Sequence, residues 1–434
     1  MRLLTSPIAN LHHAATTITL LTSTASNGTA TKSATNPAKS DNKQSLSDFC
    51  TPLIPPFYAN PLLFNSHLQT FWTASKIFGD PFTIHYTRLS LQNPRDHGHF
   101  ALDIVVPTFP DSEVGNDLPP RTRYMTESET ASFTSNDTKP MIIALHGLSG
   151  GSHEVYLRAA LFDLLKNPGW EACVVNARGC AKSKITTKQL FNARWTSDIR
   201  ATIEFLRKKF PNRPLYAIGF SLGGNILTNY LGEEGENCQL KAAVVVSNPW
   251  QLELSCKALH RTWIGKEVYS KVMGANLRRL FEANLEMLKD DPRIDAEKIL
   301  AGTYLSEFDR DLTAKVFGYK TVGAYYRDAS SVDNLLKVKV PTMVLHAEDD
   351  PIAPGEVIPY DEVKANPYVF MATTQTGGHL SWFEWGGGRW FAKPVSAFLD
   401  KFAKEVKGVE EPVEVTEELE KSEKQPAFEE ADDE

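Results

Sequence analysis

The chain has 434 residues, of which 42% are hydrophobic and 23% charged, so it is neither wholly disordered nor fibrous. Its formal net charge of −7 is uneven, because residues 409–434 hold 12 Asp and Glu against 2 Lys. The rest of the chain is weakly positive and offers no basic surface for nucleic acid, so we predict no nucleic-acid partner.

The cysteines and the apolar runs indicate where the protein functions. Five cysteines with irregular spacing and no CxxC pair favour reduced thiols over a disulfide framework or a zinc site. No run of 18 apolar residues occurs, so we predict no transmembrane segment. We therefore expect an intracellular, cytoplasmic protein.

Both ends of the chain differ in composition from the middle. Residues 1–49 include 16 Ser and Thr and no acidic residue before Asp41, which predicts a disordered segment. Mitochondrial targeting is an alternative for this segment, although it is poor in Arg. Residues 409–434 form an acidic tail that we also predict to be disordered. The folded domain is expected over residues 50–408.

Strand and helix patterns alternate through this domain. Upstream, Phe82–Leu89 and Phe100–Val106 predict an antiparallel pair. Short apolar runs rich in β-branched residues then predict strands buried on both faces of a parallel sheet, at Met141–Leu145, Cys173–Asn176, Leu215–Gly219, Ala242–Ser247, Thr342–His346 and Tyr368–Thr374. Helical patterns occupy the intervals, at Glu154–Leu165, Thr196–Lys209, Gly224–Leu231 and Pro394–Val406. The sum is an α/β fold with a mostly parallel central sheet and flanking helices.

One long stretch interrupts this alternation. Residues 251–336 contain no strand candidate and show apolar residues at helical spacing. Insertions at this place in an α/β sheet commonly cover the site below, so we predict a helical lid. A helical cap on the solvent side with no gating role is the alternative.

The segment Gly219–Gly223 (GFSLG) follows a predicted strand directly and leads into a helix. In that context a G-x-S-x-G pattern places its serine on a sharp strand-to-helix turn, with the hydroxyl lifted clear of the sheet. Ser221 is therefore the candidate nucleophile. A tight structural turn is the alternative.

A serine hydroxyl needs a neighbouring base, which in this type of fold follows the nucleophile in the order Ser, acid, His. After residue 260 the only histidines are His346 and His379, and His346 lies inside a predicted strand. His379, in a glycine-containing loop, is therefore the candidate base, with an exposed loop histidine as the alternative. The acid is expected in the loop after Thr342–His346, where Asp350 is preferred to Asp349 although spacing alone does not decide between them.

An oxyanion-binding loop is predicted after the strand Met141–Leu145, where the sequence reads His-Gly-Leu-Ser-Gly-Gly from His146. Glycines here allow backbone N–H groups to face a developing negative charge. We assign the N–H groups of Leu148 and of Leu222, the residue after the nucleophile. His146 is interpreted as structural. No nucleotide-binding or metal-binding motif occurs, so no cofactor and no metal are predicted.

Six segments between about Pro55 and Phe402 are characteristic when taken together: Asn65–Thr70 (NSHLQT), His146–Leu148 with Gly150–Ser152, Asn176–Cys180 (NARGC), Gly219–Asn225 (GFSLGGN), Asp349–Pro351 and Gly378–His379. In these segments the chain resembles the α/β-hydrolase subfamily of fungal medium-chain fatty-acid ethyl ester synthase/esterases. Related bacterial and vertebrate lipid-acting hydrolases belong to the same subfamily.

The resemblance implies a serine esterase or acyltransferase that acts on medium-chain acyl esters or thioesters and releases the acyl group to water or to a small alcohol such as ethanol. Its partners would be an acyl ester, acyl thioester or acylglycerol substrate, with peripheral association with lipid or membrane. The alternatives are a monoacylglycerol lipase or phospholipase and, in a different class, a non-catalytic homologue that only binds a ligand.

Overall fold

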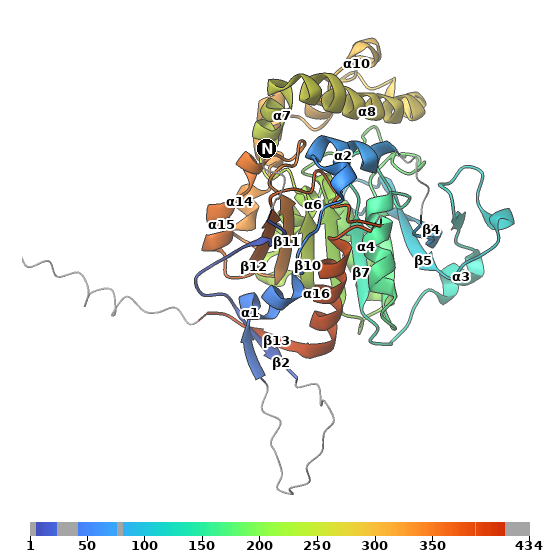
Figure 1. The fold of residues 1–434 in the computed structure, drawn as a ribbon. Coiled ribbons are helices and arrows are strands. Elements are labelled where there is room, and N and C mark those ends of the chain that lie inside the picture. Colours follow the sequence, from blue (N-terminus) through green and yellow to red (C-terminus); the bar gives the residue numbers. More distant parts are fainter. Residues whose placement is uncertain (1–5, 24–41, 76–80, 387, 413–434) are drawn as a thin grey trace, which may run out of the picture.

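A ten-stranded sheet is the centre of the computed structural model, which describes residues 6–23, 42–75, 81–386 and 388–412 (Figure 1). In spatial order its strands are β1 (Asn10–His13), β12 (Val369–Thr374), β11 (Thr342–Ala347), β10 (Leu240–Val246), β9 (Leu215–Phe220), β7 (Met141–Leu145), β8 (Glu171–Asn176), β5 (His99–Val106), β4 (His85–Gln92) and β6 (Thr122–Tyr124). The six strands from β12 to β8 run parallel, and β4 and β5 form an antiparallel pair.

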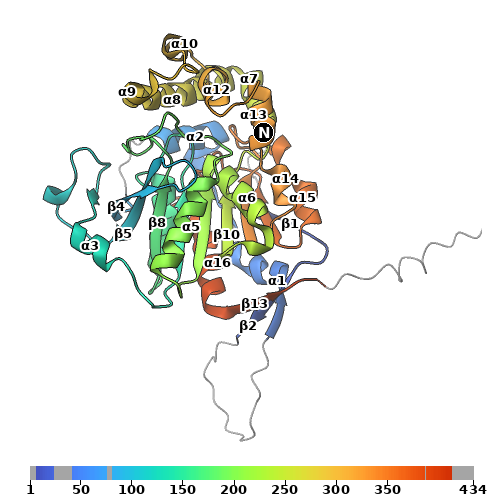
Figure 2. The ribbon, with the colours of Figure 1, turned by 180° about the vertical axis from the view of Figure 1, so that it is seen from behind.

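Helices cover both faces of the sheet. On one face, seen in front in Figure 1, are α1 (Leu46–Cys50), α4 (Val155–Leu165) and α16 (Ala392–Glu405). On the other, seen in Figure 2, are α5 (Ser197–Lys209), α6 (Leu222–Glu234), α14 (Val332–Leu335) and α15 (Tyr360–Ala365). Every residue of β7, β9, β11 and β12 is buried, because these strands are apolar on both faces. The predicted α/β fold with a mostly parallel sheet is confirmed.

The predicted disorder of residues 1–49 is wrong for the part that the structure describes. Strand β1 pairs antiparallel with β12 at the edge of the large sheet. Strands β2 (Thr19–Thr22) and β3 (Asn42–Ser45) form a second sheet with β13 (Val406–Glu410), which also carries the folded domain past residue 408. Ile18 and Leu20 are fully buried in the main core. Residues 1–5 and 24–41, and 413–434 of the acidic tail, lie outside the described residues.

The stretch from 251 to 336 is helical and contains no strand, and all of it is described. It comprises α7 (Leu252–Arg261), α8 (Lys271–Ala283), α9 (Leu285–Leu288), α10 (Ala296–Ala301), α11 (Leu305–Phe308), α12 (Ala314–Val316), α13 (Val322–Ala329), α14 and the π-helical turns η5 (Gly265–Ser270) and η6 (Asp309–Thr313). Helices α7, α8 and α10 lie above one end of the sheet, and α2 (Ser66–Ser75) lies between them and the sheet (Figure 1). No helix in the described ranges is long and apolar enough to cross a membrane.

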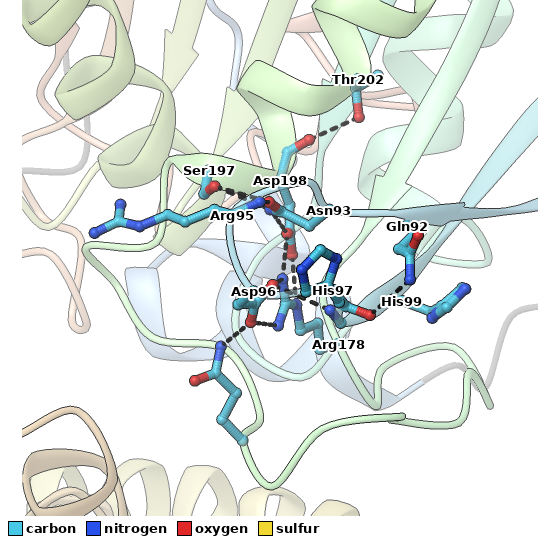
Figure 3. Close-up of polar contacts among 12 residues, drawn as sticks. Gln92, Asn93, Arg95, Asp96, His97, His99, Arg178, Ser197, Asp198 and Thr202 are labelled. Atoms are coloured by element: carbon cyan, nitrogen blue, oxygen red, sulfur yellow. Dashed lines mark hydrogen bonds and ion pairs between the residues drawn. The ribbon is translucent and has the colours of Figure 1, made fainter.

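A buried guanidinium joins the loop that follows β8 to the turn between β4 and β5 (Figure 3). Arg178 donates to both carboxylate oxygens of Asp198, at 2.8 and 3.0 Å, and pairs with Asp96, with one bond of 2.9 Å. Asn93 also donates to Asp198, at 2.6 Å. A Cβ at Gly98 would collide with the Arg178 guanidinium. Because removing one partner of a buried pair leaves an uncompensated charge, this cluster holds two sequence-distant loops together.

Substitution of Leu20 by Ala tests whether the N-terminal strands belong to the fold. Leu20 is fully buried, so we expect a loss of about 2–5 kcal/mol in the free energy of unfolding. Leu21→Ala is the matched control. The Leu21 side chain is only half-buried, so its loss should lower the free energy of unfolding by less. Urea unfolding measures both. An unchanged midpoint for Leu20→Ala would show that this strand does not pack on the domain.

Candidate active site

Ser221 lies on the turn between β9 and α6 and has a left-handed φ of 52° with ψ −119°. Its N–H donates to the carbonyl of Val246 at 2.9 Å. A Cβ at Gly219 would lie 2.5 Å from the Gly223 carbonyl oxygen, and one at Gly223 would collide with the Leu145 backbone. Both glycines are therefore required for the strand and the helix to meet this closely. The turn places Ser221 at the carboxyl end of β9, where it is largely buried and lines a cavity shared with helices of residues 251–336.

The structure brings His379 and Asp350 to this hydroxyl. His379 Nε2 lies 2.9 Å from Ser221 Oγ, and His379 Nδ1 lies 2.7 Å from Asp350 Oδ2. Asp350 Oδ1 also accepts the N–H groups of Ile352 and Ala353. Burial raises the pKa of the Asp350 carboxyl, but the His379 ring, His346 and the N–H of Ala353 together outweigh burial, so the pKa lies below its usual value. An ionised Asp350 fixes Nδ1 as the protonated nitrogen and leaves Nε2 free to accept the serine proton.

Asp349, the alternative acid, is directed elsewhere. Its Oδ1 accepts the N–H of Gly378 at 2.9 Å, and burial raises the pKa of its carboxyl to about 7. Asp349 therefore holds the backbone of the loop that carries His379, whereas Asp350 contacts the imidazole ring. Asp349 thus has a structural role in this loop, as aspartates that accept backbone N–H groups in turns commonly do.

The two N–H groups assigned to an oxyanion, those of Leu148 and Leu222, have no hydrogen-bond acceptor among the described residues. The side chains of both leucines line the same cavity as Ser221. Leu222 is the first residue of α6, where the helix dipole also favours negative charge. Unpaired donors at this position fit a negative charge that develops on a substrate oxygen.

The oxyanion loop is held from below by two buried groups. The phenol oxygen of Tyr156, on α4, accepts the N–H of Gly147 at 2.8 Å. His146 accepts the N–H of Ala177 on Nε2, at 3.0 Å, and its Nδ1 bonds the Gly147 carbonyl. Burial lowers the pKa of His146 to about 4, so the ring is neutral. The structure thus places His146 beneath the loop, as interpreted from the sequence.

Sequence reasoning gave no role to the residues that position His379. Thr70, on α2, accepts the N–H of His379 on its hydroxyl at 3.0 Å, and the Gln69 amide oxygen accepts the N–H of Phe383. These contacts join residues more than 300 positions apart. In the sequence, Gln69 and Thr70 were noted only as part of the motif Asn65–Thr70. That motif supported the family resemblance, but its residues had no predicted structural role.

A second buried ion pair fixes the start of α4 behind the oxyanion loop. Arg88 on β4 forms two hydrogen bonds with Asp103 on β5, at 2.7 and 2.8 Å. Asp103 also accepts the hydroxyl of Ser152 at 2.6 Å, and the N–H of Ser152 donates to Asn176. The β4–β5 hairpin therefore supports the Gly150–Ser152 segment by charge-assisted bonds.

Two hollows of different character meet at Ser221. One is an apolar cavity between α6 and the helices of residues 251–336, with Leu190, Phe191, Leu277, Phe308 and Leu312 among its lining side chains. The other is an open cleft with a more polar lining, which includes Ser149, Lys182, Asn276, Arg279 and His379.

Asp309 is the one carboxylate among the residues that line the apolar cavity, all of which are described. It accepts the hydroxyls of Tyr326 and Thr313, each at 2.9 Å. Burial raises the pKa of its carboxyl to about 6. The cavity therefore has a polar position in an otherwise largely aliphatic and aromatic wall.

No group of three or more His, Cys, Asp and Glu side chains in the described ranges is arranged to hold a metal ion. The residues gathered around Ser221 supply a hydroxyl, an imidazole, a carboxylate and backbone donors. These are the components of acyl transfer through a serine.

Residues 140–384 match the family described as alpha/beta hydrolase fold. The chain is 40% identical over 364 residues to a monoacylglycerol lipase of Saccharomyces cerevisiae, with 80% of each chain covered. It is 32% identical over 389 residues to medium-chain fatty acid ethyl ester synthase/esterase 2 of the same yeast, covering 80% of this chain and 86% of that one. It is 30% identical over 263 residues to phospholipase ABHD3 of Mus musculus, covering 60% and 62%. The chain belongs to the α/β-hydrolase family, which confirms the resemblance inferred from its motifs.

The roles of the two aspartates can be separated by the rate at which a fluorophosphonate labels Ser221. Asp350→Asn removes the charge that fixes the His379 tautomer, so labelling should slow on the order of 10³–10⁴-fold. Asp349→Asn keeps the oxygen that accepts the Gly378 N–H, so its labelling should stay close to that of the unchanged protein. Equal slowing in both variants would contradict the assignment of Asp350.

Proposed function

We propose that the protein is a serine hydrolase of medium-chain acyl esters, with acylglycerols as its main substrates. The observation that carries this proposal is the hydrogen-bonded chain Asp350–His379–Ser221 at the junction of an apolar cavity and a polar cleft. The 40% identical yeast monoacylglycerol lipase supports the choice of substrate.

The reaction begins at the hydroxyl of Ser221. His379 Nε2 takes the serine proton while Oγ attacks the acyl carbonyl carbon, and Asp350 stabilises the imidazolium that forms. The N–H groups of Leu148 and Leu222 hold the negative oxygen of the tetrahedral intermediate. Collapse of the intermediate expels the alcohol, which leaves with the proton from His379, and Ser221 remains acylated. His379 then activates water, whose attack releases the fatty acid and regenerates the hydroxyl.

The apolar cavity and the open cleft bind different parts of the substrate. Because His379 must protonate the departing alcohol, the alcohol lies on the side of the open cleft, which His379 lines. The acyl chain then lies in the apolar cavity, which removes its hydrocarbon surface from water. The hydroxyl and amide groups in the cleft, such as those of Ser149 and Asn276, suit a polar leaving group such as glycerol.

Acyl transfer to a small alcohol is the second candidate. It is favoured by the similarity to the yeast ethyl ester synthase/esterase over 80% of this chain. The open cleft admits an alcohol to the acyl-enzyme as readily as water, and His379 would activate either acceptor in the same way.

Product analysis with monooctanoylglycerol in water containing ethanol tests both candidates. We expect release of glycerol with octanoate as the main acyl product, because water is the more abundant acceptor. Ser221→Ala should lower both octanoate and ethyl octanoate by at least about 10³-fold. Equal turnover by Ser221→Ala would exclude the mechanism. Ethyl octanoate as the main product would assign acyl transfer instead.

A further inference from the structure

An uncharged stretch of the chain, which lines the open cleft with Thr70, Thr73 and Ala74, also exposes large apolar side chains. Residues 49–75 contain no Asp, Glu, Lys or Arg. Within this stretch Leu62, Phe64 and Phe71 are 74%, 71% and 62% exposed. Scattered surface apolar residues are ordinary, but several large ones in a segment without charge indicate a surface that contacts another apolar phase.

Helix α2 has two faces with different tasks. Gln69 and Thr70 are buried, and the Thr70 hydroxyl holds the backbone of His379. Leu68 and Phe71, three residues apart, share the outward face of the helix and are exposed. The element that positions the catalytic histidine therefore presents aliphatic and aromatic groups to the outside.

The lid contributes a second set of exposed apolar groups next to α2. Trp263 and Val272 are 74% and 51% exposed, and Val272 lines the cleft together with α2. His67 of α2 and Tyr269 of η5 stack, with His67 Nδ1 2.9 Å from the Tyr269 hydroxyl oxygen. Figure 1 shows α2 directly beneath α7 and α8. We name seven exposed apolar residues, four from the uncharged stretch and three from the segment that joins α7 to α8 and the start of α8, the rim surface: Leu62, Phe64, Leu68, Phe71, Trp263, Ile264 and Val272.

The lid helices beside the rim surface carry an excess of positive charge. Residues 252–283 contain six Lys and Arg against three Asp and Glu. Three of the six cations form ion pairs with Glu253, Glu267 and Glu356, and the cations that remain are Lys266, Arg278 and Arg279. Basic residues flanking exposed aromatic and aliphatic groups are typical of protein segments that lie in the interface of an anionic bilayer.

We propose that the rim surface docks onto a lipid bilayer that contains anionic head groups. The apolar side chains enter the boundary between head groups and acyl chains, and the basic lid residues are attracted to the anionic lipids. Docking directs the mouth of the cleft toward the bilayer, so ester substrates pass from the lipid to Ser221 without crossing bulk water. This path rests on the proposed function, whereas the docking itself does not require catalysis.

Co-sedimentation of the full chain with vesicles tests the proposal. Vesicles of phosphatidylcholine alone are compared with vesicles of equal parts phosphatidylcholine and phosphatidylglycerol, and binding should be stronger to the second. The double variant Phe71→Gln/Trp263→Gln should bind at least about tenfold more weakly, because two large apolar groups are lost from the contact. Its hydrolysis of a water-soluble acetyl ester should stay unchanged, while its turnover of monoacylglycerol embedded in vesicles falls.

Leu62→Gln and Leu336→Gln form a matched pair, since both leucines are exposed but Leu336 follows α14 at the side of the sheet. Only Leu62→Gln should weaken vesicle binding. Ser221→Ala should bind vesicles as the unchanged protein does, so a failure of the proposed reaction remains distinguishable from a failure of docking.

Equal vesicle binding by all variants, or binding by none, would overturn the proposal. The proposal would also be overturned if the Phe71→Gln/Trp263→Gln variant changed the oligomeric state in analytical ultracentrifugation but bound vesicles as before. The rim surface would then contact a second copy of the chain.

Discussion

Ser221 has a left-handed φ of 52° at the point where β9 becomes α6, a conformation that costs a non-glycine residue about 1–3 kcal/mol. The surrounding structure maintains it because Gly219 and Gly223 let strand and helix approach without a Cβ between them. The position of the hydroxyl is therefore set by the backbone rather than by side-chain packing. In the proposed mechanism the same turn supplies both the attacking oxygen of Ser221 and, from Leu222, an N–H donor for the oxyanion.

The other groups of the site are held on loops, and each loop is tied to an element distant in sequence. Thr70 on α2 holds the His379 backbone, and Tyr156 on α4 holds that of Gly147. These bonds are buried, so their loss would leave unpaired polar groups and would also displace residues of the candidate site. Helix α2 combines this positioning role with an exposed apolar face, which links the geometry of the site to the surface through which lipid would approach.

The central sheet could be predicted from the sequence because its strands are continuous apolar runs, and Ser221 because its motif follows such a strand. The choice between Asp349 and Asp350 could not be predicted from the sequence, because it depends on which of two adjacent carboxylates faces the imidazole. The N-terminal strands were missed because each is four residues long and buries only a few side chains, such as Ile18 and Leu20. The contribution of Thr70 depends on a contact across 309 residues, which local patterns do not encode.

The central claim is that Ser221 carries the acyl group between the two halves of the reaction. Rapid mixing with p-nitrophenyl octanoate, whose good leaving group makes deacylation the slower step, should accumulate the acyl-enzyme for acid quenching and peptide mass mapping. The account predicts one octanoyl group on the peptide that contains Ser221, and none on Ser221→Ala. Octanoyl attached to a different residue, or full turnover with Ser221 never acylated, would contradict it.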